Sequence, residues 1–199
     1  MEARRAHSQS CRACKETIYR LLAEAFGPGN VIQQYRLGLS SALQGYEEHP
    51  YFPTLAAIES DLKAYRGFRQ FVSRRSLPPV DFFVTSAGLI VEFDEAQHFT
   101  RPRALTLERY PAALSVRFSR QLWLQLCAEL NRHDNSPPYR DEQRAWLDTL
   151  RDFAPACLDL QPIVRVYAGA VTWCCLDLRK GGEAVLPYAP QLAQALDAR

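Results

Sequence analysis

Apolar and polar residues alternate on both sides of a small-residue turn in residues 79–100, which predicts a β-hairpin. Residues two apart in a strand share a face, so Glu92 and Asp94 leave the second strand on one side while Val91 and Phe93 leave it on the other. A hairpin with a purely structural role does not need acids there. The hairpin also carries Asp81, Gln97 and His98.

The register of this hairpin decides which acids meet. If Thr85 closes the turn opposite Gly88, Asp81 lies directly across from Glu92, with Cβ atoms about 4.5–5.5 Å apart. A three-residue loop with Gly88 in the left-handed conformation would instead place Asp81 opposite Phe93, on the other face. Two carboxylates at cross-strand distance need a compensating cation, and the simplest one is a metal ion.

Apolar periodicity predicts further helices and strands on either side of the hairpin. The first helix carries Glu16 at the head of a partly apolar face, where the carboxylate either reaches a site in the core or lies in solvent and favours the helix dipole. We expect one α/β (α+β) domain over residues 1–199, with inserted segments at about 38–75 and 101–138. The expected helices are 11–26, 54–73, 120–130, 140–153 and one from about 190, and the expected strands outside the hairpin are 30–37, 162–167 and 171–178.

Composition is that of a globular protein in water, with 47% hydrophobic and 23% charged residues among 199. No apolar run approaches a membrane span, and the polar start of the chain does not resemble a signal peptide. The six cysteines lack the density of a disulfide scaffold, so we expect reduced thiols, a cytoplasmic location and no membrane association. The net charge of +2 does not discriminate between partners.

Cys11 and Cys14 have the spacing of half a zinc site. No second Cys-x-x-Cys pair follows, so the missing ligands would have to come from His7 or from Cys174 and Cys175. The alternative is that Cys11 and Cys14 are small residues at the start of a helix. We therefore do not expect structural zinc.

Arginines supply most of the positive charge, and two groups of them are candidates for binding nucleic acid. One group is interleaved with aromatic residues, an arrangement that can hold phosphates and stack on bases; the other lies on one face of the helix predicted over 140–153. The alternatives are solvated arginines and a salt-bridged surface. The candidates are Arg66, Arg69, Arg74, Arg75, Arg140 and Arg144.

The order of these short motifs resembles the PD-(D/E)xK nuclease superfamily, which has the restriction-endonuclease-like fold. The closest branch contains proteins similar to very-short-patch repair endonucleases and their ExDxxxH relatives, and the match covers about half the chain. The resemblance implies a central mixed β-sheet flanked by helices. The matching pieces are Val80-Asp81-Phe82, Val91-Glu92-Phe93-Asp94 followed by His98, Asp141-Glu142-Gln143-Arg144, and Val164-Arg165.

The resemblance also implies roles for individual residues. Asp81 and Glu92 would hold Mg²⁺ or Mn²⁺, Glu16 would complete the metal shell, and His98 would act as general base or contact the phosphate; a satisfied core histidine is the other interpretation of His98. Asp94 occupies the position of the superfamily lysine and would bind a second ion or orient His98. The work of the lysine would pass to Gln97, His98 or a second metal, or be lost.

Two functions are therefore expected from the sequence. The first is a magnesium-dependent endonuclease that hydrolyses DNA, which the resemblance places in bacterial defence or DNA repair, with a protein of such a system as a further partner. The second is a nuclease-like module that has lost cleavage and binds nucleic acid or a partner protein. The sequence leaves open the DNA substrate and whether the chain forms a homodimer.

Overall fold

The computed structural model describes residues 12–72 and 75–175, whose central feature is a four-stranded mixed sheet. The first three strands pair antiparallel, and the last strand joins β3 in parallel. A parallel neighbour needs a long crossover connection, which the helices between β3 and β4 supply. In sheet order the strands are β1 (Val31–Tyr35), β2 (Val80–Val84), β3 (Leu89–Asp94) and β4 (Gln161–Tyr167).

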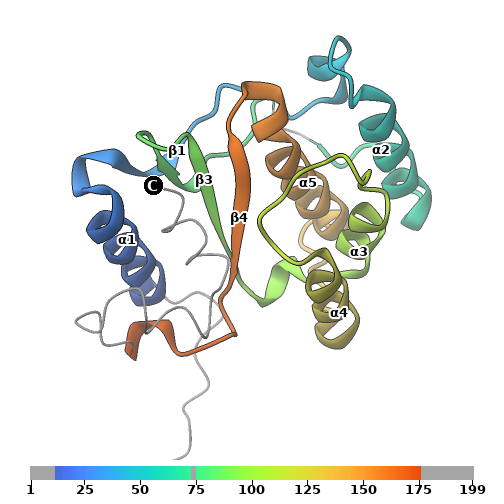
Figure 1. Cartoon of the computed structure of the whole chain (residues 1–199). Coiled ribbons are helices and arrows are strands. Elements are labelled where there is room, and N and C mark those ends of the chain that lie inside the picture. The colour runs from blue at the N-terminus through green and yellow to red at the C-terminus, as the bar shows by residue number, and fades with distance from the viewer. Residues whose placement is uncertain (1–11, 73–74, 176–199) are drawn as a thin grey trace, which may run out of the picture.

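Helix α1 (Arg12–Phe26) covers one face of the sheet (Figure 1). Its apolar stripe buries Ile18 and Leu22 against Val84 and Val91. The hydrophobic effect therefore fixes the rotation of α1 about its axis, which decides what the remaining side chains of the helix can reach.

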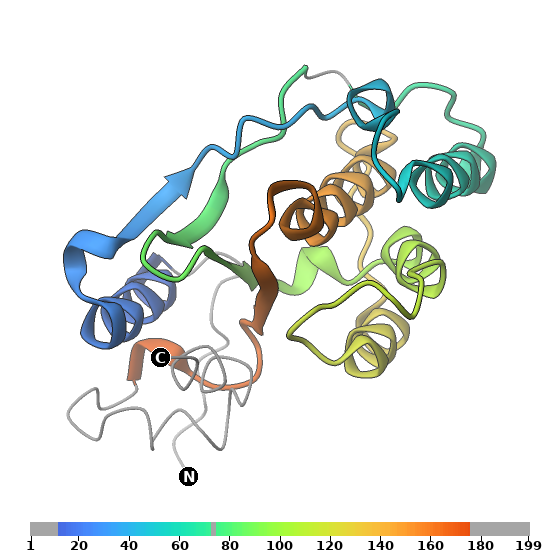
Figure 2. The same ribbon diagram turned by 45° about the horizontal axis from the view of Figure 1, so that its top comes forward.

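The opposite face packs against α5 (Arg140–Leu158), where Trp146, Leu150 and Phe153 are fully buried. Three more helices lie beyond α5 on the same side of the sheet (Figures 1 and 2). The expected α/β class, with a mixed sheet flanked by helices, is confirmed for the described residues. The three helices are α2 (Phe52–Arg66), α3 (Arg101–Glu108) and α4 (Arg120–Leu130).

Several element boundaries differ from the predicted ones. Helix α2 ends at Arg66 instead of continuing to 73, because Gly67 adopts the left-handed conformation (φ 78°) that terminates a helix. Helix α3 was not predicted; Thr100 caps it by accepting a hydrogen bond from the Arg103 N–H. The predicted strand over 171–178 is wrong for its described part, which forms the short helix Trp173–Cys175.

Helix α2 lies in the first of the predicted inserted segments, at about 38–75, and helices α3 and α4 lie in the second, at about 101–138 (Figure 1). The predicted helix from about 190 lies outside the described residues. Within the described part of the chain, no helix is long and apolar enough to span a membrane.

Candidate functional site

The β2–β3 hairpin has the register that brings Asp81 and Glu92 together. The paired residues are Phe82 with Val91 and Val84 with Leu89, so the loop between Val84 and Leu89 has an even number of residues. Continuing this register by one residue places Asp81 opposite Glu92, as predicted. Gly88 adopts a positive φ of 58° in the turn, which a residue without a Cβ accommodates readily.

The two strands separate where Asp81 and Glu92 face each other. The Asp81 backbone N–H donates to Glu92 Oε1 at 3.1 Å, and the Phe93 backbone N–H donates to Asp81 Oδ2 at 3.0 Å. Side-chain carboxylates accept both of these backbone bonds, and the pairing between the two strands ends at Phe82 and Val91. This local opening explains why two acids are structurally tolerated here, and it places both carboxylates at one end of the sheet.

Each of the two carboxylates also has a cation beside it. Lys15 on α1 places Nζ 2.6 Å from Asp81 Oδ1, and Arg151 on α5 places Nε 3.5 Å from Glu92 Oε1. The positive charges offset the like-charge repulsion between the acids. Sequence reasoning missed Lys15 and Arg151, although both occupy predicted helices.

Glu16, the acid predicted to complete a metal shell, is not brought to this site. Its carboxylate is 47% exposed and pairs with Arg20 at 3.2 Å. The residue of α1 that reaches the hairpin is its neighbour Lys15, because successive residues of a helix point about 100° apart. The interpretation of Glu16 as a solvated residue therefore describes the structure better, although Glu16 lies beyond the first turn of α1.

Glu92 is the buried member of the pair, with a side chain only 5% exposed. Burial raises the pKa of Glu92 to about 7, with Arg151 opposing the shift and Asp81 adding to it. A nearby cation would oppose this shift and favour the ionised form.

Asp94 belongs to a buried network of ion pairs and hydrogen bonds. Arg165 Nη1 and the Trp123 indole N–H donate to its two oxygens at 2.6 and 2.7 Å, respectively. Arg165 also donates from Nε to Asp152 at 2.6 Å, and Arg103 donates to the same carboxylate. Because its oxygens are already engaged, Asp94 is poorly suited to bind a second ion.

His98 is held by Asp148, whose Oδ2 lies 2.8 Å from Nδ1, whereas Asp94 Oδ1 is 3.9 Å away. Burial alone would lower the pKa of His98, but the charge and hydrogen bond of Asp148 outweigh it and raise the pKa. Arg151 contacts both Asp148 and Glu92, at 3.2 and 3.5 Å. His98 is thereby connected to Glu92 through two intervening side chains.

Gln97 points toward another acid. Its Nε2 donates to Glu95 Oε2 at 2.6 Å, and its backbone carbonyl accepts a hydrogen bond from Arg144. Glu95 Oε1 is buried and has no hydrogen-bond partner among the described residues. The structure gives Gln97 no contact with Asp81 or Glu92.

Three of the arginines predicted to bind nucleic acid are tied to acids. Arg66 donates to Glu142 at 2.6 Å, Arg144 donates to Asp134 at 2.9 Å, and Arg140 lies 3.9 Å from the same Asp134. The salt-bridged surface that was the alternative interpretation is therefore present. Arg69 and Arg75 are exposed and have no acidic partner among the described residues, and Arg74 lies outside them.

The described residues do not form a closed ligand set around Asp81 and Glu92. Within residues 12–72 and 75–175, no group of three or more His, Cys, Asp or Glu side chains is arranged to hold a metal. A divalent cation at Asp81 and Glu92 would have to complete its shell with backbone carbonyls or water, as hard cations commonly do. Cys14 is a buried residue of α1 and faces the core, and Cys11 lies outside the described residues.

Comparisons with protein-family models, curated proteins and solved structures give no match for this chain. The resemblance to nucleases therefore depends on the motifs and their order along the sheet.

Proposed function

We propose that the protein is a metal-dependent endonuclease that hydrolyses phosphodiester bonds in DNA. The observation that carries the proposal is the pair of carboxylates, Asp81 and Glu92, held at the opening between β2 and β3. The strand order, an antiparallel β1–β2–β3 meander with β4 parallel to β3, supports the resemblance to the restriction-endonuclease-like fold.

In this proposal a divalent cation such as Mg²⁺ or Mn²⁺ would bind between Asp81 and Glu92, displace Lys15 from Asp81, and complete its shell with backbone carbonyls or water. Asp81 and Glu92 offer the hard oxygen ligands that such ions prefer, and Glu92 is a buried carboxylate whose ionised form a cation would stabilise. When bound, the ion supplies Lewis-acid polarisation of a phosphate and lowers the pKa of a coordinated water.

The side chains around the pair have distinct roles in this proposal. Lys15 supplies a positive charge beside Asp81, and it would be available to pair with a phosphate oxygen if a metal took its place at the carboxylate. His98, oriented through Nδ1 by Asp148, can take up or release a proton at Nε2. Arg151 contacts the carboxylates of both Glu92 and Asp148 and keeps them close to each other.

Cleavage assays with matched variants test the proposal. Plasmid, nicked, branched and mismatched DNA should be cut in Mg²⁺ or Mn²⁺, and Asp81→Asn and Glu92→Gln should each lower the rate at least about 100-fold. Asp61→Asn is the control, because it removes an acid whose partner is the exposed Arg109. Wild-type protein that is inert on every substrate, or variants as active as the control, would contradict the enzyme proposal.

The ion pairs themselves favour a second candidate, a nuclease-like module that binds nucleic acid or a partner protein without cutting. Lys15 and Arg151 already compensate Asp81 and Glu92 without a metal. Calorimetric titration with Mn²⁺ separates the two candidates, since a module of this kind would show no metal uptake that depends on Glu92.

A further inference from the structure

Gln34 has an unusual backbone conformation for a residue inside a strand. Its φ is +53°, in the left-handed region that strands do not use and that a side chain disfavours. Among the described residues that are not glycine, Asn131 and Asp159 also have positive φ, but both are C-caps of helices, where a left-handed residue is common. A helix cap does not explain Gln34.

The left-handed residue moves β1 from one face of the sheet to the other. Val31 packs in the core that α1 covers, whereas Tyr35 stacks on Phe83 in the core on the α5 side, with ring centroids 4.5 Å apart. In a regular strand, two residues four positions apart share a face. This change of face requires the backbone angle at Gln34 but not the glutamine, because glycine adopts a positive φ without the steric cost.

The Gln34 side chain contacts Asp81. The register of β1 and β2 places Gln34 directly across from Asp81, and its Nε2 donates to Asp81 Oδ1 at 3.3 Å. The same oxygen accepts from Lys15 Nζ at 2.6 Å, and the Phe93 backbone N–H donates to Oδ2 at 3.0 Å. The carboxylate of Asp81 is therefore oriented by one cation and by two neutral donors.

We propose that Gln34 is a positioning residue, which holds the Asp81 carboxylate in this orientation when a divalent cation binds beside Glu92. The inference rests on the function proposed above. Lys15 cannot keep this role, because a dication at the same carboxylate repels the ammonium group. A neutral amide is not repelled in this way, so it keeps its hydrogen bond while the ion takes another lone pair of the oxygen. The glutamine thus remains at a strained position because its side chain serves the site.

Two substitutions separate the amide of Gln34 from its backbone angle. Gln34→Gly removes the side chain and keeps the left-handed turn, whereas Gln34→Met keeps the length of the side chain and the strain but removes the amide. In Mn²⁺ calorimetry on the full chain, both variants should bind about three- to tenfold more weakly than wild type, which is the effect of one neutral hydrogen bond. In urea, Gln34→Gly should unfold at a higher concentration than Gln34→Met, because glycine accommodates the positive φ.

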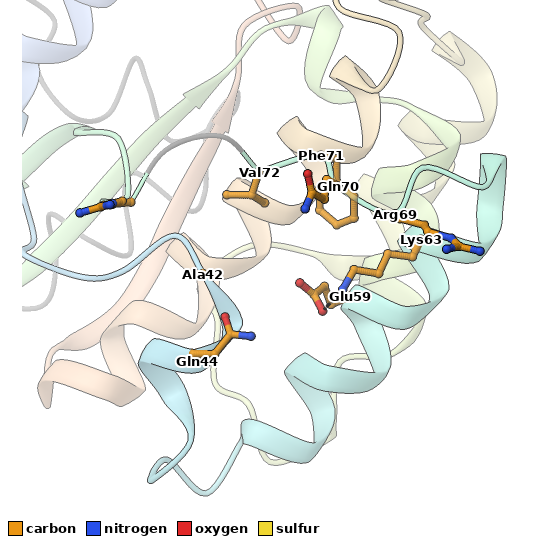
Figure 3. Close-up of a pocket in the computed structure, with 9 residues that line it drawn as sticks. Ala42, Gln44, Glu59, Lys63, Arg69, Gln70, Phe71 and Val72 are labelled. Carbon is orange, nitrogen blue, oxygen red and sulfur yellow. Dashed lines mark hydrogen bonds and ion pairs between the residues drawn. The ribbon is translucent and has the colours of Figure 1, made fainter.

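The same two substitutions at Gln33 are the matched controls. Gln33 is an exposed glutamine of the same strand that pairs with Phe82, and its φ is not positive. Both Gln33 variants should bind Mn²⁺ as wild type does, and Gln33→Gly should unfold at a lower urea concentration, because glycine weakens a regular strand. Asp81→Asn, which should abolish Mn²⁺ binding, is compared with Glu59→Gln. Glu59 also lies 2.6 Å from a lysine, Lys63, but it lines a separate cavity beside α2 (Figure 3).

The outcomes distinguish a failure of this inference from a failure of the nuclease proposal. If either Gln34 variant binds Mn²⁺ as tightly as the Gln33 control with the same substitution, the amide does not position Asp81 and the inference is overturned. The proposed metal site still stands in that case, provided that Asp81→Asn abolishes binding and Glu59→Gln does not. If wild type shows no Mn²⁺ binding that depends on Asp81, both the metal site and the role of Gln34 are overturned.

Discussion

Replacing Arg165 should destabilise the protein more than any loss of a surface ion pair. The side chain is fully buried, and it donates to Asp94 and to Asp152 at 2.6 Å each. It also donates to the Asp148 backbone carbonyl at 3.1 Å. Arg165→Met preserves much of the volume but leaves two buried carboxylates without their shared cation.

The size of the effect follows from what remains around the two acids. Asp152 keeps Arg103 and the Tyr110 hydroxyl, whereas Asp94 keeps the Trp123 indole. Removing one partner of a buried pair costs about 3–5 kcal/mol, because the other charge is left uncompensated. For a domain of this length, that corresponds to a fall in melting temperature of roughly 10 °C.

Urea unfolding followed by circular dichroism measures the difference, with Arg109→Met as control. Arg109 Nε lies at the same distance, 2.6 Å, from Asp61, but its side chain is 56% exposed. The control should unfold close to the wild-type urea concentration, because exposed pairs contribute little. If Arg165→Met and Arg109→Met have equal midpoints, burial does not set the strength of these ion pairs and the reasoning is refuted.

Three further predictions follow from individual side chains. Burial raises the pKa of Glu92 to about 7, and a metal binds only the deprotonated carboxylate. The Mn²⁺ affinity measured by calorimetry should therefore rise about tenfold per pH unit below pH 7 and level off above it. An affinity that does not depend on pH would exclude Glu92 as a ligand. Burial disfavours the charged His98 ring, but Asp148 outweighs it and raises the pKa of His98. In urea unfolding, wild type should therefore be more stable than His98→Gln by a full margin below about pH 6.5, and this margin should shrink as the pH rises through the folded-state pKa. A margin that grows with pH would contradict the assignment. Gly67→Ala should lower the free energy of unfolding by about 1 kcal/mol in the same assay, because a Cβ is disfavoured at a φ of 78°. Gly29→Ala is the control, because its φ is not positive and a Cβ would meet no atom within 4 Å. Equal losses for the two variants would show that the left-handed conformation at Gly67 does not require glycine.

The hairpin was predictable because its signal is local. Alternation with a period of two fixes which side chains share a face, and an even loop fixes the partner of Asp81. The contact between Lys15 and Asp81 spans 66 positions and depends on how α1 is rotated over the sheet. Pattern left Glu16 either near the site or in solvent, and the resemblance implied the metal shell; the side chain that reaches Asp81 is the neighbouring Lys15.

The ion-pair network was only partly visible in the sequence. An arginine between Val164 and Val166 in an apolar strand requires a buried partner, but no local rule names that partner. The sequence therefore suggests that Asp94 binds a second ion or orients His98, whereas in the structure it pairs with Arg165 in the neighbouring strand. Helix α3 was missed because its charged residues obscure any apolar period, and its start is marked mainly by the cap at Thr100.

The most direct test of the nuclease proposal is a crystal grown or soaked with Mn²⁺ and measured for anomalous scattering. The account predicts one peak within about 2.5 Å of carboxylate oxygens from both Asp81 and Glu92, with the Lys15 ammonium displaced from Asp81. A crystal in which Lys15 still pairs with Asp81, and in which no anomalous peak lies between the two carboxylates, would contradict it.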